Sequence, residues 1–253
     1  MLSSLSVVYP MYNEKDNIET AVAEALRVGY KMAPHLEIVV VDDASTDGCG
    51  AIVDRLAAQH SEVVSLHHAR NRKLGGALRT GFAAARNDWI LYMDSDLPIQ
   101  MDDALNALPL AQNADMVIGW RLSRAESKRR EIISWVYNRM FRYGFGLRVK
   151  DVNFAFKLFK REFYAKTLLH SEGSFIDAEL LLEMQRVGAR IAEMPLEYHP
   201  RVAGVSTLSS WNVIFKILEE MSLYRLLSFV PHRRRERLYA RRERRRLRLE
   251  RGR

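Results

Sequence analysis

The chain has 253 residues, of which 48% are hydrophobic and 28% are charged, and its formal net charge is +8. This size and hydrophobic content predict one folded α/β domain of roughly 200 to 250 residues, and they argue against two domains of equal size. The single cysteine, Cys49, excludes an intrachain disulfide framework and fits a reducing cytosol.

The positive charge is concentrated at the C-terminus. Residues 232–253 hold twelve Arg and three Glu, a charge of +9 against +8 for the whole chain, which leaves −1 for residues 1–231. This Arg-rich tail fits an anchor on an anionic membrane surface, a solvated arm, or a nucleic-acid contact. Because no aromatic-and-basic RNA-reading motif accompanies the tail, nucleic acid is the least favoured partner.

Apolar, β-branched runs and stretches with helical spacing alternate along the chain. The predicted strands and helices follow in chain order: strand 5–9, helix 18–28, strand 36–41, helix 50–59, strand 63–67, helix 75–85, strand 89–93, helix 103–111, strand 115–119, helix 132–143, strand 155–159, helix 178–187 and strand 190–195. Such alternation predicts a mostly parallel sheet with helices on both faces.

A further amphipathic helix is expected within residues 209–231, before the tail. Its apolar face suits either packing on the protein's own core or lying in a lipid interface. The first predicted strand begins almost at once, so no signal peptide is expected. No window of 18 or more apolar residues occurs, so no transmembrane helix is expected either.

Acidic residues follow two of the apolar runs. Asp42 and Asp43 end one run, and Asp94 and Asp96 end another, where parallel strands open onto the ligand cleft of α/β sheets. A single Asp in this position often caps the next helix, which is our interpretation of Asp47. Asp94 and Asp96 are different, because two carboxylates one residue apart repel each other unless a cation lies between them. They predict a divalent cation that holds a phosphate.

Several motifs together carry a family resemblance. They are Pro10-Met11-Tyr12-Asn13-Glu14, Asp94-Ser95-Asp96, Gly119-Trp120-Arg121 and the segments 41–47, 73–81, 151–159 and 201–206. Over residues 5 to about 208 the chain resembles inverting family 2 glycosyltransferases of the GT-A fold. Within that family it is most similar to polyprenyl-phosphate (dolichyl-phosphate) mannose and glucose synthases.

The resemblance implies transfer of a hexose from a nucleoside-diphosphate sugar, of the GDP-mannose or UDP-glucose type, to polyprenyl phosphate, with Mg²⁺ or Mn²⁺. The implied nucleotide-sugar contacts are Pro10, Tyr12, Glu14, Asp42, Asp43, Lys73, Gly75, Asp94, Ser95 and Asp96. The segment 73–76 starts a predicted helix, where unpaired backbone N–H groups and the absence of glycine side chains suit close approach of phosphate.

Asp94 and Asp96 are the implied metal ligands: in the resemblance they flank the cation, one reaching the ribose or sugar side and the other binding the metal and the diphosphate. Pro98 stands where several relatives have Gln, so Gln100 is the candidate third ligand. The implied acceptor-phosphate contacts are Arg121, Arg130, Ser134, Arg201 and Ser206, and the implied catalytic residues are Asp94, Asp96, Asp151 and Arg130.

The expected organisation is a glycosyltransferase domain at 1–208, the amphipathic helix at 209–231 and the tail at 232–253, in a cytoplasmic protein peripheral to the cytosolic membrane face.

One alternative is a hydroxyl acceptor, which requires a general base such as Asp151, Asp177 or Glu179. Another is a catalytically silent GT-A domain that binds membrane. The sequence leaves the sugar, the nucleobase, the lipid length and the oligomeric state open.

Overall fold

A computed structural model describes residues 1–122, 138–198, 211–231 and 233–241, with the side chains of 211–218 outside the described part. The chain divides into two compact units, Met1–Ser206 and Thr207–Arg253. The first unit contains the sheet, and the second contains α8 and the Arg-rich tail.

The first unit is built on a seven-stranded sheet in the order β3-β2-β1-β4-β6-β5-β7. The strands are β1 (Leu5–Met11), β2 (Leu36–Asp42), β3 (Val63–His67), β4 (Trp89–Met93), β5 (Met116–Arg121), β6 (Phe156–Lys160) and β7 (Ile191–Leu196). Among these described strands only β6 runs antiparallel to its neighbours. The predicted α/β class with a mostly parallel sheet is therefore confirmed.

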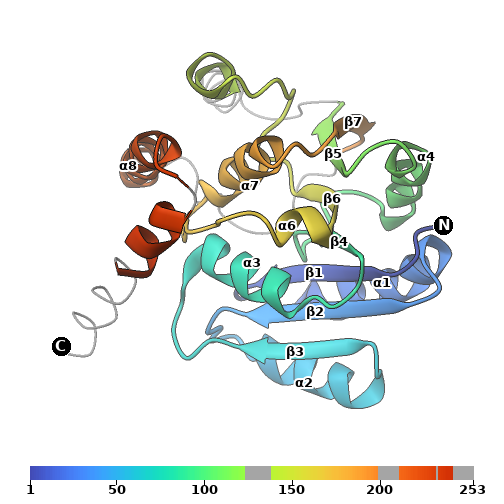
Figure 1. The fold of residues 1–253 in the computed structure, drawn as a ribbon. Coiled ribbons are helices and arrows are strands. Elements are labelled where there is room, and N and C mark those ends of the chain that lie inside the picture. Colours follow the sequence, from blue (N-terminus) through green and yellow to red (C-terminus); the bar gives the residue numbers. More distant parts are fainter. Residues whose placement is uncertain (123–137, 199–210, 232, 242–253) are drawn as a thin grey trace. The chain divides into compact units, whose positions relative to one another are not determined.

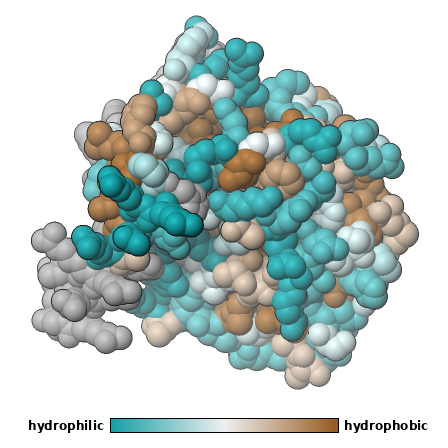
Figure 2. Space-filling model, in the orientation of Figure 1, coloured by the Kyte–Doolittle hydropathy of each residue, from teal (hydrophilic) through white to brown (hydrophobic). Residues whose placement is uncertain are grey.

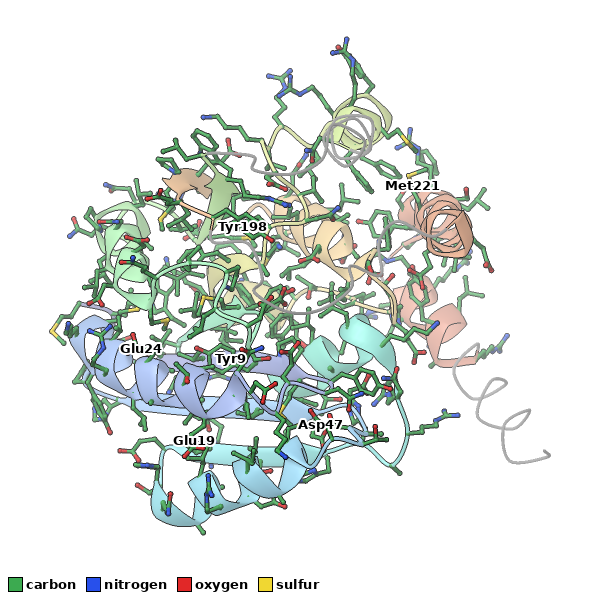
Figure 3. All side chains as sticks on the ribbon, turned by 180° about the vertical axis from the view of Figure 1, so that it is seen from behind. Tyr9, Glu19, Glu24, Asp47, Tyr198 and Met221 are labelled. Atoms are coloured by element: carbon green, nitrogen blue, oxygen red, sulfur yellow. The ribbon has the colours of Figure 1, made fainter. Side chains whose placement is uncertain are left out.

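Helices cover both faces of the sheet. They are α1 (Ile18–Met32), α2 (Cys49–Gln59), α3 (Lys73–Ala84), the 3-10 helix η1 (Met101–Asn106), α4 (Ala107–Ala111), α6 (Arg161–Tyr164) and α7 (Ile176–Arg186). Helices α1 and α2 lie on one face, whereas α3 and α7 lie on the other (Figures 1 and 3). Because the central strands are covered on both sides, β2 and β4 are almost continuously buried and apolar.

The strand register brings several loops to one edge of the sheet. Met11 lies opposite Asp42 and Met93 lies opposite Phe156, so β1, β2 and β4 end where β6 begins. Arg121, at the end of β5, lies opposite Leu196 at the end of β7. We call this the carboxyl edge, formed by residues 12–17, 43–48, 94–100, 151–155 and 197–198. Asp43, Asp94 and Asp96 lie in these segments, and Asp42 is the last residue of β2.

Backbone strain is concentrated between the ends of the first four strands and the starts of the helices that follow them. Among the described residues, those other than glycine with positive φ are Asn13, Ala44, Lys73 and Leu97, with φ of 57°, 62°, 62° and 49°. Such conformations cost on the order of 1–3 kcal/mol each and persist only where surrounding contacts hold them. Three of these residues, Asn13, Ala44 and Leu97, lie in the carboxyl edge, so surrounding contacts must hold the backbone of that edge in place.

The second unit contains α8 (Trp211–Ser228) and a helical stretch at 233–241. The carbonyl of Pro231 accepts the backbone N–H groups of Arg234 and Arg235 at 2.9 and 3.0 Å, which starts the second stretch. The guanidinium carbon of Arg235 lies 5.8 Å from the centre of the Tyr224 ring, a cation–π contact between the two helical segments. None of the described helices has the length and apolar character needed to cross a bilayer.

Candidate active site

Hydrogen bonds tie the loop after β1 to the loop after β2. Asn13 donates its backbone N–H to Ser45 Oγ at 3.0 Å, and Asn13 Oδ1 accepts from the Thr46 N–H at 2.8 Å. Asp47 accepts from the Lys15 N–H at 2.9 Å and from the Cys49 N–H at 3.0 Å. Asp47 therefore satisfies the first N–H of α2, as predicted, and also anchors the neighbouring loop (Figure 3).

The candidate nucleoside contacts from the first loop differ in how they are held. Tyr12 is 48% exposed, so one of its surfaces is available for stacking. Glu14 Oε2 accepts from the Asn17 amide at 2.7 Å, and the Glu14 carbonyl accepts from the N–H groups of Asn17 and Ile18. Glu14 thus belongs to the turn that starts α1. Pro10 is half-buried near the end of β1.

Asp42 is held by the turn after β2 and by a histidine. Asp42 Oδ1 accepts from the Ser45 N–H at 2.9 Å, and Asp42 Oδ2 lies 3.1 Å from His67 Nδ1. The pKa of His67 is raised, first by its hydrogen bond to Asp54 and also by Asp42. A Cβ on Gly50 would lie 2.7 Å from Asp42 Oδ2, so the small residue leaves room for this carboxylate.

Asp43 is buried and is oriented by a second histidine. Its Oδ1 accepts from His68 Nδ1 at 2.7 Å and from the Arg72 N–H at 2.7 Å. His68 Nε2 lies 2.9 Å from Thr80 Oγ1 on α3. Neither histidine is among the residues predicted from the sequence, although the His67-His68 pair at the end of a predicted strand is a visible signal.

Gly75 lies in the first turn of α3, close to another part of the backbone. Its N–H donates to the Glu172 carbonyl at 2.8 Å, and a Cβ would meet the Ser171 carbonyl oxygen at 2.2 Å. Glycine is needed here because another part of the backbone approaches closely. The Gly75 N–H is therefore used in an internal contact, whereas the roles of Lys73 and Gly75 in nucleotide-sugar binding stay predictions.

The acidic pair follows β4 directly. Asp94 and Asp96 are half-buried and Ser95 between them is buried. The buried Tyr92 hydroxyl donates to Asp94 Oδ1 at 3.4 Å. Burial raises the pKa of Tyr92 well above its usual value, and the negative charges of Asp177, Asp94 and Asp96 raise it further. Three carboxylates therefore act on the buried end of β4.

Arg121 and Asp151 form an ion pair at the same edge. Arg121 Nε lies 2.9 Å from Asp151 Oδ2, and Asp151 is 3% exposed. The Arg121 guanidinium carbon also lies 5.7 Å from the Phe154 ring centre and 5.3 Å from that of Tyr198. Among the residues that the structure describes, no group hydrogen-bonds to Asp151 Oδ1, which is a buried polar atom.

A second buried ion pair joins β6 to α7. Lys157 Nζ lies 2.5 Å from Asp177 Oδ1 and 2.8 Å from the Phe154 carbonyl. Burial raises the pKa of Asp177, and Lys157 opposes that shift. Glu179 accepts the backbone N–H groups of His170 and Ser171 at 2.9 and 2.8 Å. Both acidic residues of α7 considered as general bases are thus committed to internal contacts.

The charges around the end of β4 suit a divalent cation. Four carboxylates, from Asp94, Asp96, Asp151 and Asp177, accompany two cationic side chains, from Arg121 and Lys157. In the described part of the chain, no three His, Cys, Asp or Glu side chains are grouped as a metal site. The candidate metal ligands are therefore Asp94, Asp96 and a third ligand that is not His, Cys, Asp or Glu. Gln100 stays a prediction for that third ligand.

Gln100 is exposed and immediately precedes η1. Its carbonyl accepts from the Asp103 N–H at 3.0 Å. The candidate acceptor-phosphate residues Arg130, Ser134, Arg201 and Ser206 lie outside the described residues. Of that group, the structure describes Arg121.

Comparisons with known proteins agree with this fold. Residues 6–168 match the family described as Glycosyl transferase family 2. The glycosyltransferase AglD of Haloferax volcanii is 31% identical over 207 residues, which cover 78% of this chain and 33% of that protein. The polyprenol monophosphomannose synthase of Mycolicibacterium smegmatis is 29% identical over 236 residues, which cover 84% of this chain and 85% of that protein.

A solved structure supports the fold. Glucosyl-3-phosphoglycerate synthase from Mycobacterium tuberculosis, in complex with Mn²⁺ and UDP-glucose, aligns with a TM-score of 0.64 at 19% identity and covers 89% of this chain and 78% of its own. The predicted GT-A fold is confirmed. The chain belongs to glycosyltransferase family 2 and is a glycosyltransferase.

Proposed function

We propose that this enzyme transfers a hexose from a nucleoside-diphosphate sugar to polyprenyl phosphate, with inversion at the anomeric carbon and with Mg²⁺ or Mn²⁺. The observation that carries the proposal is the arrangement of Asp94 and Asp96 at the same sheet edge as the Arg121–Asp151 pair. The two aspartates suit a cation-bound diphosphate, and Arg121 of the ion pair suits an anionic acceptor. The mycobacterial relative, whose length is 85% covered, has a name that states the same reaction class.

On the donor side, Tyr12, Asp42 and Asp43 bind the nucleoside and Lys73 approaches the diphosphate. Asp42 and Asp43 are each held in place by a neighbouring histidine, which limits the conformational freedom lost on binding. Asp94 and Asp96 hold the cation, which when bound acts as a Lewis acid on the leaving group.

On the acceptor side, Arg121 contacts the lipid phosphate, together with Arg130, Ser134, Arg201 and Ser206. A phosphate oxygen forms the new bond to the anomeric carbon, while the bond from that carbon to the donor's diphosphate breaks and the leaving group takes the electron pair. The phosphate is already ionised at neutral pH, so no general base has to remove a proton. This explains why Asp177 and Glu179 can be used in internal contacts.

The second unit is proposed to hold the enzyme at an anionic, cytosolic membrane surface. Leu226 and Phe229 are 71% and 74% exposed, unusual fractions for large apolar side chains. Arg225 is exposed beside them, and Arg233, Arg234, Arg237 and Arg241 are exposed in the next helical stretch. Hydrophobic residues lie over α8 next to hydrophilic ones (Figure 2). Apolar insertion and basic charge together suit binding to an anionic lipid surface.

A donor screen tests the proposed reaction. Purified protein, Mn²⁺ or Mg²⁺ and a short polyprenyl phosphate are incubated with GDP-mannose or UDP-glucose, and release of GDP or UDP is followed against a control without lipid. Release from one donor that depends on the lipid is the expected result. Release that is indifferent to lipid would instead favour a hydroxyl acceptor, with Asp151 as the base, and no release with any donor would favour a silent fold.

A further inference from the structure

Tyr92 occupies an unusual position for a polar side chain. It lies in β4, two residues before Asp94, in a strand that is otherwise apolar, and only 1% of its surface is exposed. A buried hydroxyl needs a hydrogen-bond partner, and the partner here is the carboxylate of Asp94 at 3.4 Å. The Tyr92 hydroxyl is thus hydrogen-bonded to a candidate metal ligand, from the buried side of that residue.

The Tyr92 ring is itself fixed by contacts with other elements. Lys157 Nζ of β6 lies 5.2 Å from the ring centre, and Phe82 of α3 makes an edge contact with a centre-to-centre distance of 6.1 Å. Lys157 is held in turn by Asp177 of α7. A buried ion pair is costly to break, since one unpaired charge would remain in the interior. The ring therefore has little freedom to move, and its hydroxyl is a fixed donor.

We propose that Tyr92 is a positioning residue for the cation site, holding the carboxylate of Asp94 in the orientation that binds Mn²⁺ or Mg²⁺. The inference rests on the proposed function, because it takes Asp94 as a metal ligand. Partners that orient a ligating carboxylate contribute strongly to metal affinity. The contact deepens the assignment of Asp94 by naming the residue that orients it.

Tyr92→Phe in the full chain tests the proposal, because it removes the hydroxyl and keeps the ring contacts with Lys157 and Phe82. Binding of Mn²⁺ alone is measured by the loss of the free-ion EPR signal. The dissociation constant is expected to rise about tenfold, the lower end of the range for partners of metal ligands. Tyr9→Phe is the matched control, since Tyr9 is equally buried in β1 and donates to the Ala21 carbonyl at 3.3 Å.

Turnover as a function of Mn²⁺ concentration gives a second readout. The Mn²⁺ concentration for half-maximal rate should rise in Tyr92→Phe, while the rate at saturating Mn²⁺ should return close to that of the unchanged enzyme. If Tyr92 has a purely structural role, the rate of Tyr92→Phe will be lower at every Mn²⁺ concentration, including saturating Mn²⁺. That result would overturn the proposal. Equal Mn²⁺ affinity in both Phe variants and the unchanged enzyme would overturn it and leave the proposed function standing. Failure of the unchanged enzyme to bind Mn²⁺ would contradict both the positioning role of Tyr92 and the metal-dependent reaction under Proposed function.

Discussion

Asp96 is the residue at which the metal assignment is tested most directly. We expect Asp96→Ala to abolish nucleotide release in the presence of donor, lipid and Mn²⁺, because one of two adjacent carboxylates is lost. The melting temperature should stay nearly unchanged, since removal of Asp96 relieves repulsion from Asp94. Asp88→Ala is the control, because Asp88 is exposed and accepts from the Ser3 hydroxyl just before β4 begins, at the other end of the strand. Full activity of the Asp96 variant would remove the metal assignment.

Glu179 links folding stability to pH. Burial raises its pKa from 4.5 to about 7, even though two backbone N–H groups stabilise the carboxylate. Its folded-state pKa lies above its unfolded value, so the stability it contributes is fully present below about pH 4.5 and is lost as the pH rises through 7.

We therefore expect Glu179→Gln to gain stability over the unchanged protein as the pH rises. The difference in free energy of unfolding should grow by about 3 kcal/mol between pH 4.5 and pH 8, at 1.36 kcal/mol per pKa unit. Urea unfolding at both pH values measures it, with Glu162→Gln as an exposed control. A difference that does not change with pH would show that Glu179 is already ionised at little cost in the folded protein.

At the same scale, sequence patterns located the acidic residues better than their partners. Asp42, Asp94 and Asp96 stand out because they follow apolar runs directly or within three residues. Tyr92 and Lys157 do not, since their significance depends on contacts between β4, β6 and α7 that no local pattern encodes. The packing of Gly75 against residues 171–172 was not predictable, because a glycine that approaches a phosphate and a glycine that packs against another backbone segment look identical in a sequence.

Among the elements, α3 depends on a close approach between its first turn and residues 171–172. Gly75→Ala would place a methyl group 2.2 Å from the Ser171 carbonyl oxygen, and backbone cannot yield as a flexible side chain does. We expect a loss of about 1–3 kcal/mol in the free energy of unfolding, the usual cost of overpacking.

The control for this prediction is Gly144→Ala, where an added Cβ meets nothing within 4 Å and φ is not positive. Chemical unfolding of both variants, monitored by circular dichroism, gives the comparison. Equal stability of the two variants would mean that the 171–172 segment moves aside freely.

The order of elements was predictable because buried strands and amphipathic helices have distinct spacings. The predicted strand at 63–67 and helix at 50–59 agree with β3 and α2 to within one residue. The helix predicted at 103–111 is divided into η1 and α4. The reversed direction of β6 was not predictable, because the spacing of side chains in a strand is the same for both directions.

For the whole molecule, the division of charge gives a test of membrane association. Truncation after Pro231 removes a charge of +9 and leaves a nearly neutral chain. We expect weaker binding to vesicles that contain anionic lipid, because each basic residue near such a surface contributes roughly 1 kcal/mol. Nucleotide binding should be retained, since the candidate nucleoside contacts all lie in the first unit.

Co-sedimentation with vesicles at low and physiological salt measures this binding, and neutral vesicles serve as the control. A full-length variant with Leu226→Ser and Phe229→Ser separates the apolar contribution from the charge, since it keeps every Arg. Unchanged binding of the truncated chain at physiological salt would contradict a role for the tail as an anchor.

The antiparallel direction of β6 has a consequence for how the reaction distance is controlled. Met93, which ends β4, and Phe156, which begins β6, are paired across neighbouring strands, at a spacing of about 4.8 Å. Asp94 and Asp96, the candidate metal ligands, follow β4 where β6 begins. In the proposed function, the hydrogen-bonded ladder between these two strands sets the distance between the donor side and the acceptor side. Sequence changes in the surrounding loops would alter which molecules bind before they altered how far apart the reacting groups are held.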